Sequence, residues 1–320
     1  MNGSASPNWA AALCTGDVRT AARMISRIEA ADPVVETVLA ALYARGGHTP
    51  VFGITGPPGA GKSTLVDQML ARLRAGGRRV AVLAVDPSSP YSGGAILGDR
   101  VRMGRHNSDP GVFIRSMAAR GRLGGLARAA GDALQVLDAM GWDAILVETV
   151  GVGQNEIDVV RHADTVVILQ TPSSGDELQA VKAGLSEVGD LFVVNKSDAP
   201  GADRIVAALR EALEAQAHVR DPERWNVPVL KTQAVEGIGV DELLAVMWAH
   251  HHHLVTHPEQ KARRRRTQVR AQIADRVAEL LRRAHETAPE EAGFARWLED
   301  VVERRSDPMT AARRFVAGLA

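Results

Sequence analysis

A glycine-rich stretch that ends in a lysine and two hydroxyl residues carries the clearest chemistry in this sequence. It reads Gly56-Pro57-Pro58-Gly59-Ala60-Gly61-Lys62-Ser63-Thr64 and lies between an apolar run, residues 51–55, and a helix-forming segment, residues 64–70. A strand, a glycine-rich turn and a helix in this order form a phosphate-binding P-loop. Glycines let the backbone close around an anion, and the helix N-terminus directs amide hydrogens at it. We therefore expect these residues to bind a nucleotide, with Lys62 on its β- and γ-phosphates and Ser63 on Mg²⁺.

A second motif, Asn195-Lys196-Ser197-Asp198, follows an apolar strand-like run. An aspartate at the position of Asp198 can accept two hydrogen bonds from the N1 and N2 edge of guanine, which adenine cannot offer. Asn195 and Lys196 would brace the loop and cover the base. A looser stretch after the last predicted strand makes Ala234 a further candidate contact. The sequence thus favours GTP over ATP.

An acidic residue at the end of another predicted strand is a candidate for sensing the γ-phosphate. In Glu148-Thr149-Val150-Gly151, the carboxylate would hold Mg²⁺ and the Gly151 amide would contact the phosphate. The residue after Gly151 is Val152, so a glutamine that orients the attacking water is missing from its usual place. Gln154 lies three residues on, and the group that positions the water stays open.

Two aspartates lie in loops near the predicted P-loop. Asp86 follows the second predicted strand, and Asp99 comes a short loop later. Both could complete the Mg²⁺ shell, directly or through water. The alternative is ordinary turn chemistry, since Asp-Pro-Ser and Gly-Asp sequences form turns. From the residues alone, both interpretations stand.

Three further clusters have a simple alternative to a functional role. The acidic residues in Gly175-Asp176-Glu177-Leu178-Gln179-Ala180-Val181-Lys182 could merely favour a helix start. The run His250–His253 suggests a metal, but consecutive residues on a helix point in different directions. The run Arg263–Arg266 could bind nucleic acid, but no aromatic residues are interleaved with it, and it fits the exposed first turn of a helix.

The elements that must position these residues alternate between strands and helices. Predicted strands are Val51–Thr55, Val80–Val85, Val112–Arg115, Ala144–Glu148, Thr165–Gln170, Leu191–Asn195 and Val227–Thr232, with helices between them such as Leu126–Met140 and Ala202–Ala217. Most of these strands are continuous apolar runs, as expected of parallel strands covered on both faces. The predicted fold is α/β, a doubly wound, mostly parallel sheet with ligands at the carboxyl ends of its strands.

The predicted domain organisation has three parts. Residues 1–48 form a helical segment, with Asp17 as the cap of one of its helices, and residues 49–256 form the nucleotide-binding domain. Residues 257–320 form a helical arm whose apolar stripe includes Val269, Ile273 and Val277. Such a stripe needs a partner surface, either the nucleotide-binding domain or a second copy of the chain.

Composition excludes several classes of protein. The formal net charge is +0, which argues against a general nucleic-acid binder. One cysteine, Cys14, excludes internal disulfides and a thiolate metal cage within one chain. No apolar run is long enough to span a bilayer, and the N-terminus lacks the layout of a signal peptide. We expect a cytoplasmic protein without a membrane partner.

With these motifs in place, the chain resembles the MeaB/ArgK family of P-loop GTPases. Besides the P-loop, the resemblance rests on the strings Ala-Val-Leu-Ala-Val-Asp-Pro-Ser-Ser, Gly-Gly-Ala-Ile-Leu-Gly-Asp-Arg-Val-Arg-Met, Val-Glu-Thr-Val-Gly-Val-Gly-Gln-Asn-Glu, Gly-Asp-Glu-Leu-Gln and Asn-Lys-Ser-Asp. It implies a GTP-hydrolysing chaperone of an adenosylcobalamin-dependent acyl-CoA mutase, which gates cofactor loading and protects the mutase. Which mutase is served stays open.

The resemblance also implies roles for particular residues. The family's Mg²⁺ and switch positions fall on Ser63, Asp86, Asp99 and Glu148. The catalytic group would be Asp86, Asp99 and Glu148 together with Lys62. An additional switch loop that couples to the partner falls on Gly175, Asp176, Glu177, Gln179 and Lys182. The family implies a homodimer formed through C-terminal helices. This sequence departs from the family pattern at Gln233-Ala234 and in its tail, so the dimer geometry stays open.

Two other functions share a P-loop. A kinase would transfer the phosphate to an acceptor other than water, and the guanine motif argues against it. A nickel-insertion GTPase of similar architecture would need metal ligands, and the lone Cys14 and the poorly placed His250–His253 run disfavour it.

Overall fold

The computed structural model of this chain describes residues 8–86, 103–106, 108–118, 125–149, 162–172, 189–216, 225–287 and 292–317. These residues belong to two compact units, Met1–Arg265 and Arg266–Ala320. Among the described residues, no helix is both long enough and apolar enough to cross a bilayer.

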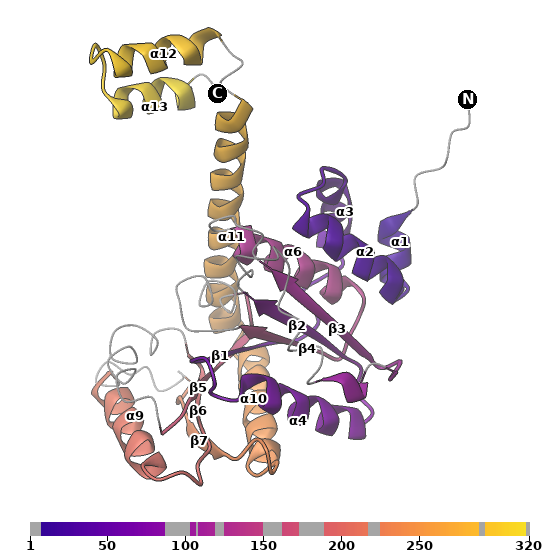
Figure 1. Ribbon diagram of the computed structural model, residues 1–320. Coiled ribbons are helices and arrows are strands. Elements are labelled where there is room, and N and C mark those ends of the chain that lie inside the picture. The colour runs from indigo at the N-terminus through magenta and orange to yellow at the C-terminus, as the bar shows by residue number, and fades with distance from the viewer. Residues whose placement is uncertain are drawn as a thin grey trace. The chain divides into compact units, whose positions relative to one another are not determined.

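A parallel sheet forms the centre of the first unit. Across the described residues, seven strands pair in the order β3-β2-β4-β1-β5-β6-β7 (Figure 1). They are β1 (Val51–Thr55), β2 (Val80–Asp86), β3 (Val112–Ala118), β4 (Ala144–Thr149), β5 (Thr165–Gln170), β6 (Leu191–Asn195) and β7 (Val229–Thr232). Four of them, β1, β4, β5 and β6, are buried along their whole length. Their unbroken apolar runs therefore reflect cover on both faces.

Helices cover both faces of the sheet. Apolar residues of α4 (Lys62–Ala75) and α10 (Val240–Thr256) share one core with the sheet. Those of α6 (Gly125–Ala139) and α9 (Ala202–Gln216) share the other. Figure 1 shows α9 and α10 on opposite sides of β5–β7. The predicted doubly wound α/β fold is confirmed.

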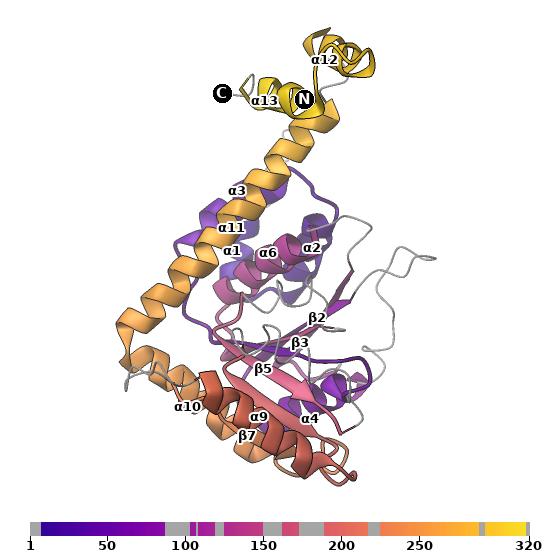
Figure 2. The ribbon, with the colours of Figure 1, turned by 90° about the vertical axis from the view of Figure 1, so that its left-hand side faces the viewer.

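The N-terminal helices extend the second of these cores. They are α1 (Trp9–Cys14), α2 (Val18–Glu29) and α3 (Val34–Tyr43), and α2 and α3 pack on α6 (Figure 2). Asp17 caps α2 as predicted, accepting hydrogen bonds from the amides of Arg19 at 2.9 Å and Thr20 at 3.3 Å. The fully buried Met24 and Leu42 belong to the same apolar cluster as α6. The N-terminal segment therefore packs as part of the first unit.

The second unit is helical. It holds the later part of α11 (Pro258–Thr287), together with α12 (Ala292–Val302) and α13 (Pro308–Ala317). Three rings join these helices edge to face, with His285 5.3 Å from Phe294 and 5.9 Å from Phe315 between centroids. Along α11, the apolar side chains Ile273 and Val277 are 59% and 50% exposed. The described residues of this unit therefore have a partly exposed cluster of three rings and an exposed apolar stripe on α11.

Candidate nucleotide-binding site

The P-loop connects the central strand β1 to α4, and two of its glycines are required by close neighbours. A Cβ atom on Gly56, whose φ is 154°, would lie 2.6 Å from the Leu169 carbonyl oxygen of β5. A Cβ atom on Gly61, whose φ is 90°, would lie 2.4 Å from Asn195 Nδ2. Both backbone conformations favour glycine. The loop is thus packed directly against β5 and the end of β6.

Lys62 begins α4 and is 5% exposed. Its ammonium nitrogen donates to the carbonyl oxygens of Gly56 at 2.6 Å and Pro57 at 2.8 Å. A buried ammonium group needs such partners. The Lys62 side chain therefore folds back over the P-loop, which directly precedes α4, and places its charge inside that loop.

Ser63 and Glu148 bring two oxygen atoms together beside Lys62. The Ser63 hydroxyl donates to Glu148 Oε1 at 2.5 Å, and the two residues are 6% and 1% exposed. Glu148 reaches this place because it is paired with Ile54 between the adjacent strands β4 and β1. A hydroxyl and a carboxylate are oxygen ligands of the kind that Mg²⁺ prefers. These two residues therefore fit the implied metal.

Two threonines beside this pair were not singled out by sequence reasoning. Thr149 Oγ1 donates to Thr55 Oγ1 at 2.9 Å, joining the ends of β4 and β1, and both side chains are buried. In the sequence, each of them stands at the carboxyl end of a predicted strand, which was the available signal.

Asn195, at the end of β6, joins three parts of the site. Its Nδ2 donates to the Ala60 carbonyl oxygen of the P-loop at 2.7 Å. Its Oδ1 accepts from Thr232 Oγ1 and from the Ala234 amide, both at 3.0 Å. Lys196, whose φ is 55°, donates from Nζ to the Gly59 carbonyl oxygen at 2.9 Å. Both residues thus brace the P-loop.

The two remaining residues that are predicted to contact the guanine base, Asp198 and Ala234, have different surroundings. Asp198 is exposed, with a side chain that is open to a ligand. Ala234 is 3% exposed and lies in a turn that Gln233 and Ile238 close through two backbone hydrogen bonds of 3.0 and 3.2 Å. The described residues that are predicted to bind phosphate, metal and base therefore line one edge of the sheet, at the carboxyl ends of β1, β4 and β6 and next to β7.

Comparison with known proteins agrees with this arrangement. The sequence model of the family described as methylmalonyl Co-A mutase-associated GTPase MeaB matches residues 21–290. The chain belongs to the MeaB family of GTPases. It is 43% identical to a candidate GTPase of Pyrococcus horikoshii over 94% of both chains. It is 41% identical to the mitochondrial methylmalonic aciduria type A homolog of Mus musculus, over 66% of this chain and 51% of the mouse protein.

A solved structure shares the fold of this MeaB-family chain. The crystal structure of an LAO/AO transport system kinase matches it with a TM-score of 0.69 and 26% sequence identity, covering 100% of this chain and 99% of that chain. The resemblance predicted from the motifs is therefore confirmed at the level of the family and the fold.

Several predicted site residues lie outside the described residues of this MeaB-family chain. They are Asp99, Gly151 and the predicted switch residues Gly175, Asp176, Glu177, Gln179 and Lys182. Asp86 is described by its backbone, which ends β2 and is paired with Ala118 of β3. That position is at the same edge of the sheet as the P-loop. The roles of these residues stay predictions.

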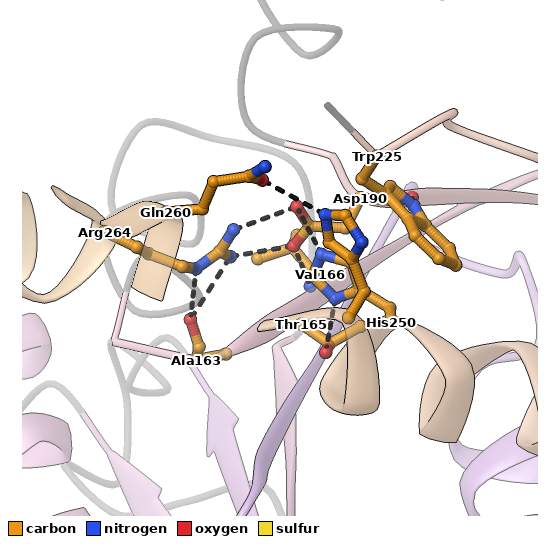
Figure 3. Close-up of polar contacts among 9 residues, drawn as sticks. Ala163, Thr165, Val166, Asp190, Trp225, His250, Gln260 and Arg264 are labelled. Atoms are coloured by element: carbon orange, nitrogen blue, oxygen red, sulfur yellow. Dashed lines mark hydrogen bonds and ion pairs between the residues drawn. The ribbon is translucent and has the colours of Figure 1, made fainter. Parts of the chain in front are cut away.

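The histidine run of α10 lies elsewhere. Within the described part of the chain, no group of three or more His, Cys, Asp or Glu side chains could hold a metal ion. His250 is 2% exposed, with Nδ1 2.8 Å from Thr165 Oγ1 and Nε2 3.5 Å from Asp190 Oδ1 (Figure 3). Burial lowers the pKa of His250 to about 4, although the Asp190 carboxylate opposes this shift. The imidazole is therefore neutral at pH 7 and serves packing.

Asp190 is the centre of this second polar cluster (Figure 3). Its carboxylate accepts from Arg264 Nη1 at 2.9 Å and Nη2 at 2.7 Å, and from the Val166 amide at 2.8 Å. Its carbonyl oxygen accepts from the Trp225 indole nitrogen at 2.9 Å. Asp190 directly precedes β6, so the cluster lies at the amino ends of the strands, away from the nucleotide edge. It fastens the first turns of α11 to the sheet.

Proposed function

We propose that this chain is a Mg²⁺-dependent GTP hydrolase whose nucleotide state controls an adenosylcobalamin-dependent acyl-CoA mutase. The observation that carries the nucleotide part is the buried link from Asn195 to the P-loop and to Ala234. It brings a phosphate-binding loop and a base-binding loop into one site. Membership of the MeaB family supports the mutase part.

The described residues divide the work of hydrolysis between them. Lys62 moves from the Gly56 and Pro57 carbonyl oxygens to the β- and γ-phosphates, where its charge offsets the negative charge that develops on the transferred group. The α4 N-terminus adds amide donors for the phosphates. Asp198 accepts from the guanine edge. Each group acts through position and charge, and none forms a covalent intermediate.

Ser63 and Glu148 would hold Mg²⁺, joined by Asp86 and Asp99. When bound, the ion would supply positive charge to the β- and γ-phosphate oxygens. Glu148 is 1% exposed beside the Ser63 hydroxyl, so its carboxylate is already directed at the place where that hydroxyl would coordinate. Ser63 of the P-loop and Glu148 of β4 would therefore fix where the metal binds.

The conformational change on hydrolysis would be the output, transmitted through Gly175–Lys182 to the mutase. The family description and the name of the mouse relative, methylmalonic aciduria type A homolog, support this partner. We expect slow hydrolysis by the chain alone, because the usual glutamine is absent after Gly151. The test is phosphate release with and without a cognate mutase. Faster release with the mutase is expected, and equal turnover would count against the proposal.

The helical arm, residues 257–320, would form a homodimer. The exposed apolar stripe of α11, including Ile273 and Val277, supports this assignment. Light scattering of the full chain should give twice the monomer mass. Replacing both residues by glutamate should restore the monomer mass, and a monomeric unmodified chain would exclude the dimer.

A kinase activity is the second candidate, because a solved structure that shares the fold is that of an LAO/AO transport system kinase. Labelled γ-phosphate distinguishes the two functions. Label recovered as inorganic phosphate supports the hydrolase, and label on a protein or small-molecule acceptor supports the kinase.

A further inference from the structure

The turn between β7 and α10, residues 233–239, carries Ala234, a predicted contact of the guanine base. Paired backbone hydrogen bonds close the two ends of the turn, and inside it the Gly237 amide donates to the Ala234 carbonyl oxygen at 3.4 Å. The apolar side chains Val235 and Ile238 are 77% and 54% exposed. Packing of these side chains therefore contributes little to holding the turn in place.

Arg72 of α4 contacts the side of this turn that faces away from Asn195. Its Nη2 donates to the carbonyl oxygen of Gly237, a buried residue, at 2.7 Å. Its Nη1 donates to Gln68 Oε1 at 2.9 Å, and its Nε lies 3.0 Å from Asp241 Oδ1 of α10. Each nitrogen of the guanidinium group thus has a partner, which fixes the orientation of the planar group. Because the donor is charged, this contact holds Gly237 more strongly than a hydrogen bond between neutral groups would.

The turn is also fitted closely to this pair of α4 side chains. Gly237 has a φ of 71°, and a Cβ atom on it would lie 2.6 Å from Arg72 Nη2 and 3.3 Å from Gln68 Oε1. The backbone of the turn therefore lies directly against Arg72 and Gln68.

A continuous path of described contacts joins Arg72 to the nucleotide site. From Gly237 it passes to Ala234, whose amide donates to Asn195 Oδ1 at 3.0 Å. Asn195 Nδ2 then donates to the Ala60 carbonyl oxygen of the P-loop at 2.7 Å, and the P-loop leads back into α4. The turn is thus held from two sides, by Asn195 and by Arg72.

Arg72 is placed to affect one end of the site only. It follows Lys62, the first residue of α4, by ten residues, which is about 15 Å along the helix axis. Its described contacts are with the turn and with its neighbours on α4 and α10, rather than with the P-loop.

We propose that Arg72 is a positioning residue for the base: by holding Gly237 it keeps Ala234 in place and thereby sets the affinity of the site for the guanine part of the nucleotide. The inference rests on the proposed function, in which Ala234 contacts guanine. Without Arg72 the turn would have to be ordered when the nucleotide binds, and that ordering would reduce the affinity.

The experiment compares two ligands on the full chain, by competition against a fluorescent GDP in the presence of Mg²⁺. GDP reaches both ends of the site, whereas pyrophosphate reaches only the phosphate end. For Arg72→Met, the affinity for GDP should fall about tenfold, the order expected from losing a hydrogen bond to a charged group. Its affinity for pyrophosphate should be unchanged. An equal loss for both ligands, or no loss for GDP, would overturn the proposal.

Arg74→Met is the matched control. Arg74 lies on the same helix, and its side chain is 22% exposed against 26% for Arg72. It pairs with Asp109, to which Nε and Nη2 donate at 2.8 Å, and not with the turn. This variant loses the same charge from the same helix, so both of its affinities should match those of the unmodified chain. A GDP-specific loss in Arg74→Met would show that charge, rather than the contact with Gly237, is responsible.

Arg72→Lys covers the case in which Arg72→Met does not fold. Lysine keeps the charge and the long aliphatic stem, but one ammonium group cannot reproduce the planar fork of the guanidinium. Its GDP affinity should lie between those of the unmodified chain and Arg72→Met, again with unchanged pyrophosphate binding. A GDP affinity equal to that of the unmodified chain would contradict the positioning role.

Hydrogen exchange without nucleotide tests the route itself. Peptides that contain residues 233–239 should exchange faster in Arg72→Met than in the unmodified chain or in Arg74→Met, whereas peptides of the P-loop should not. Unchanged exchange in the turn would refute the route.

The affinities also separate this inference from the proposed function. An unmodified chain that bound GDP and ADP equally would refute the guanine assignment and, with it, a role of Arg72 in guanine affinity. A chain that preferred GDP, but whose Arg72→Met variant lost no GDP affinity, would refute the role of Arg72 alone.

Discussion

His250 should make the first unit acid-labile in a defined pH range. Its pKa falls from 6.5 to about 4 mainly because burial disfavours the charged form. The Asp190 carboxylate raises this pKa, whereas Arg264, His253 and His251 lower it further. Because the unfolded chain binds a proton at a higher pH than the folded chain, the contribution to stability is fully present above pH 6.5. It is lost as the pH falls from 6.5 towards 4.

The size of the effect follows from the two pKa values. Each unit of difference between the folded and unfolded pKa values corresponds to about 1.4 kcal/mol of stability. The change from pH 7 to pH 5 spans only part of the interval between these two pKa values, so only part of this free energy is lost. We expect the free energy of unfolding to be about 2 kcal/mol lower at pH 5 than at pH 7 because of His250 alone. This pH interval lies above the range in which ordinary aspartates take up protons.

Urea unfolding followed by tryptophan fluorescence is a suitable assay, since the Trp225 ring lies 4.9 Å from the His250 ring. His250→Asn removes the titrating group and should remove most of the difference between pH 7 and pH 5, whatever its stability at pH 7. His252→Asn is the matched control, because His252 is exposed in the same run and its replacement should leave the difference intact. If His250→Asn and the unmodified chain lost the same free energy of unfolding between pH 7 and pH 5, the reasoning would be refuted.

Three further outcomes are expected. Gly61→Ala should weaken GTP binding by roughly tenfold or more in calorimetry, because strain of about 1–3 kcal/mol adds to the clash with Asn195 Nδ2; unchanged affinity would contradict the loop geometry. Asp190→Asn should lower the free energy of unfolding by about 3 kcal/mol in urea titrations, because it breaks the paired contact with the Arg264 guanidinium. Asp203→Asn, which breaks an exposed ion pair with Lys231, should cause no measurable change in the free energy of unfolding. Equal losses for Asp190→Asn and Asp203→Asn would contradict this ranking. Chelation of Mg²⁺ should weaken GTP binding more than guanosine binding, and an equal loss for both would exclude a metal at the phosphates.

Much of the sheet could be predicted from the sequence because its strands are buried on both faces. β5 and β6 have the predicted bounds, since each is a continuous apolar run preceded by an aspartate. β7 begins at Val229 rather than at the predicted Val227, with Pro228, which has no amide hydrogen to donate, just before it. β3 continues to Ala118 beyond the predicted Arg115, because an edge strand tolerates polar residues.

The nucleotide site was predictable in part for a similar reason. Its motifs are local, so Lys62, Ser63 and Asn195 could be assigned before any partner was known. The pairing of Ser63 with Glu148 depended on β1 and β4 being neighbours, which only the strand order supplies. The Lys62 contacts to its own loop were not predicted, since the sequence motif describes the nucleotide-bound state.

The second polar cluster lay beyond sequence reasoning. Asp190 contacts Arg264, 74 residues away, and no local pattern marks either residue as half of a pair. The run His250–His253 drew attention as a metal motif, whereas His250 is a buried neutral residue and Arg264 of the arginine run binds a carboxylate. The contact between Arg105 and Asp67 is of the same kind, because these two residues are 38 apart in the sequence.

Asn195 uses both ends of its amide within the protein, on the Ala60 carbonyl oxygen and on Thr232 and Ala234. The loops that are predicted to contact the phosphates and the base are thus joined before a nucleotide binds. Fixing a flexible backbone at the moment of binding costs about 1–2 kcal/mol per residue in lost conformational entropy. Here that ordering accompanies folding, so even pyrophosphate, which reaches only one end of the site, meets a preorganised cradle.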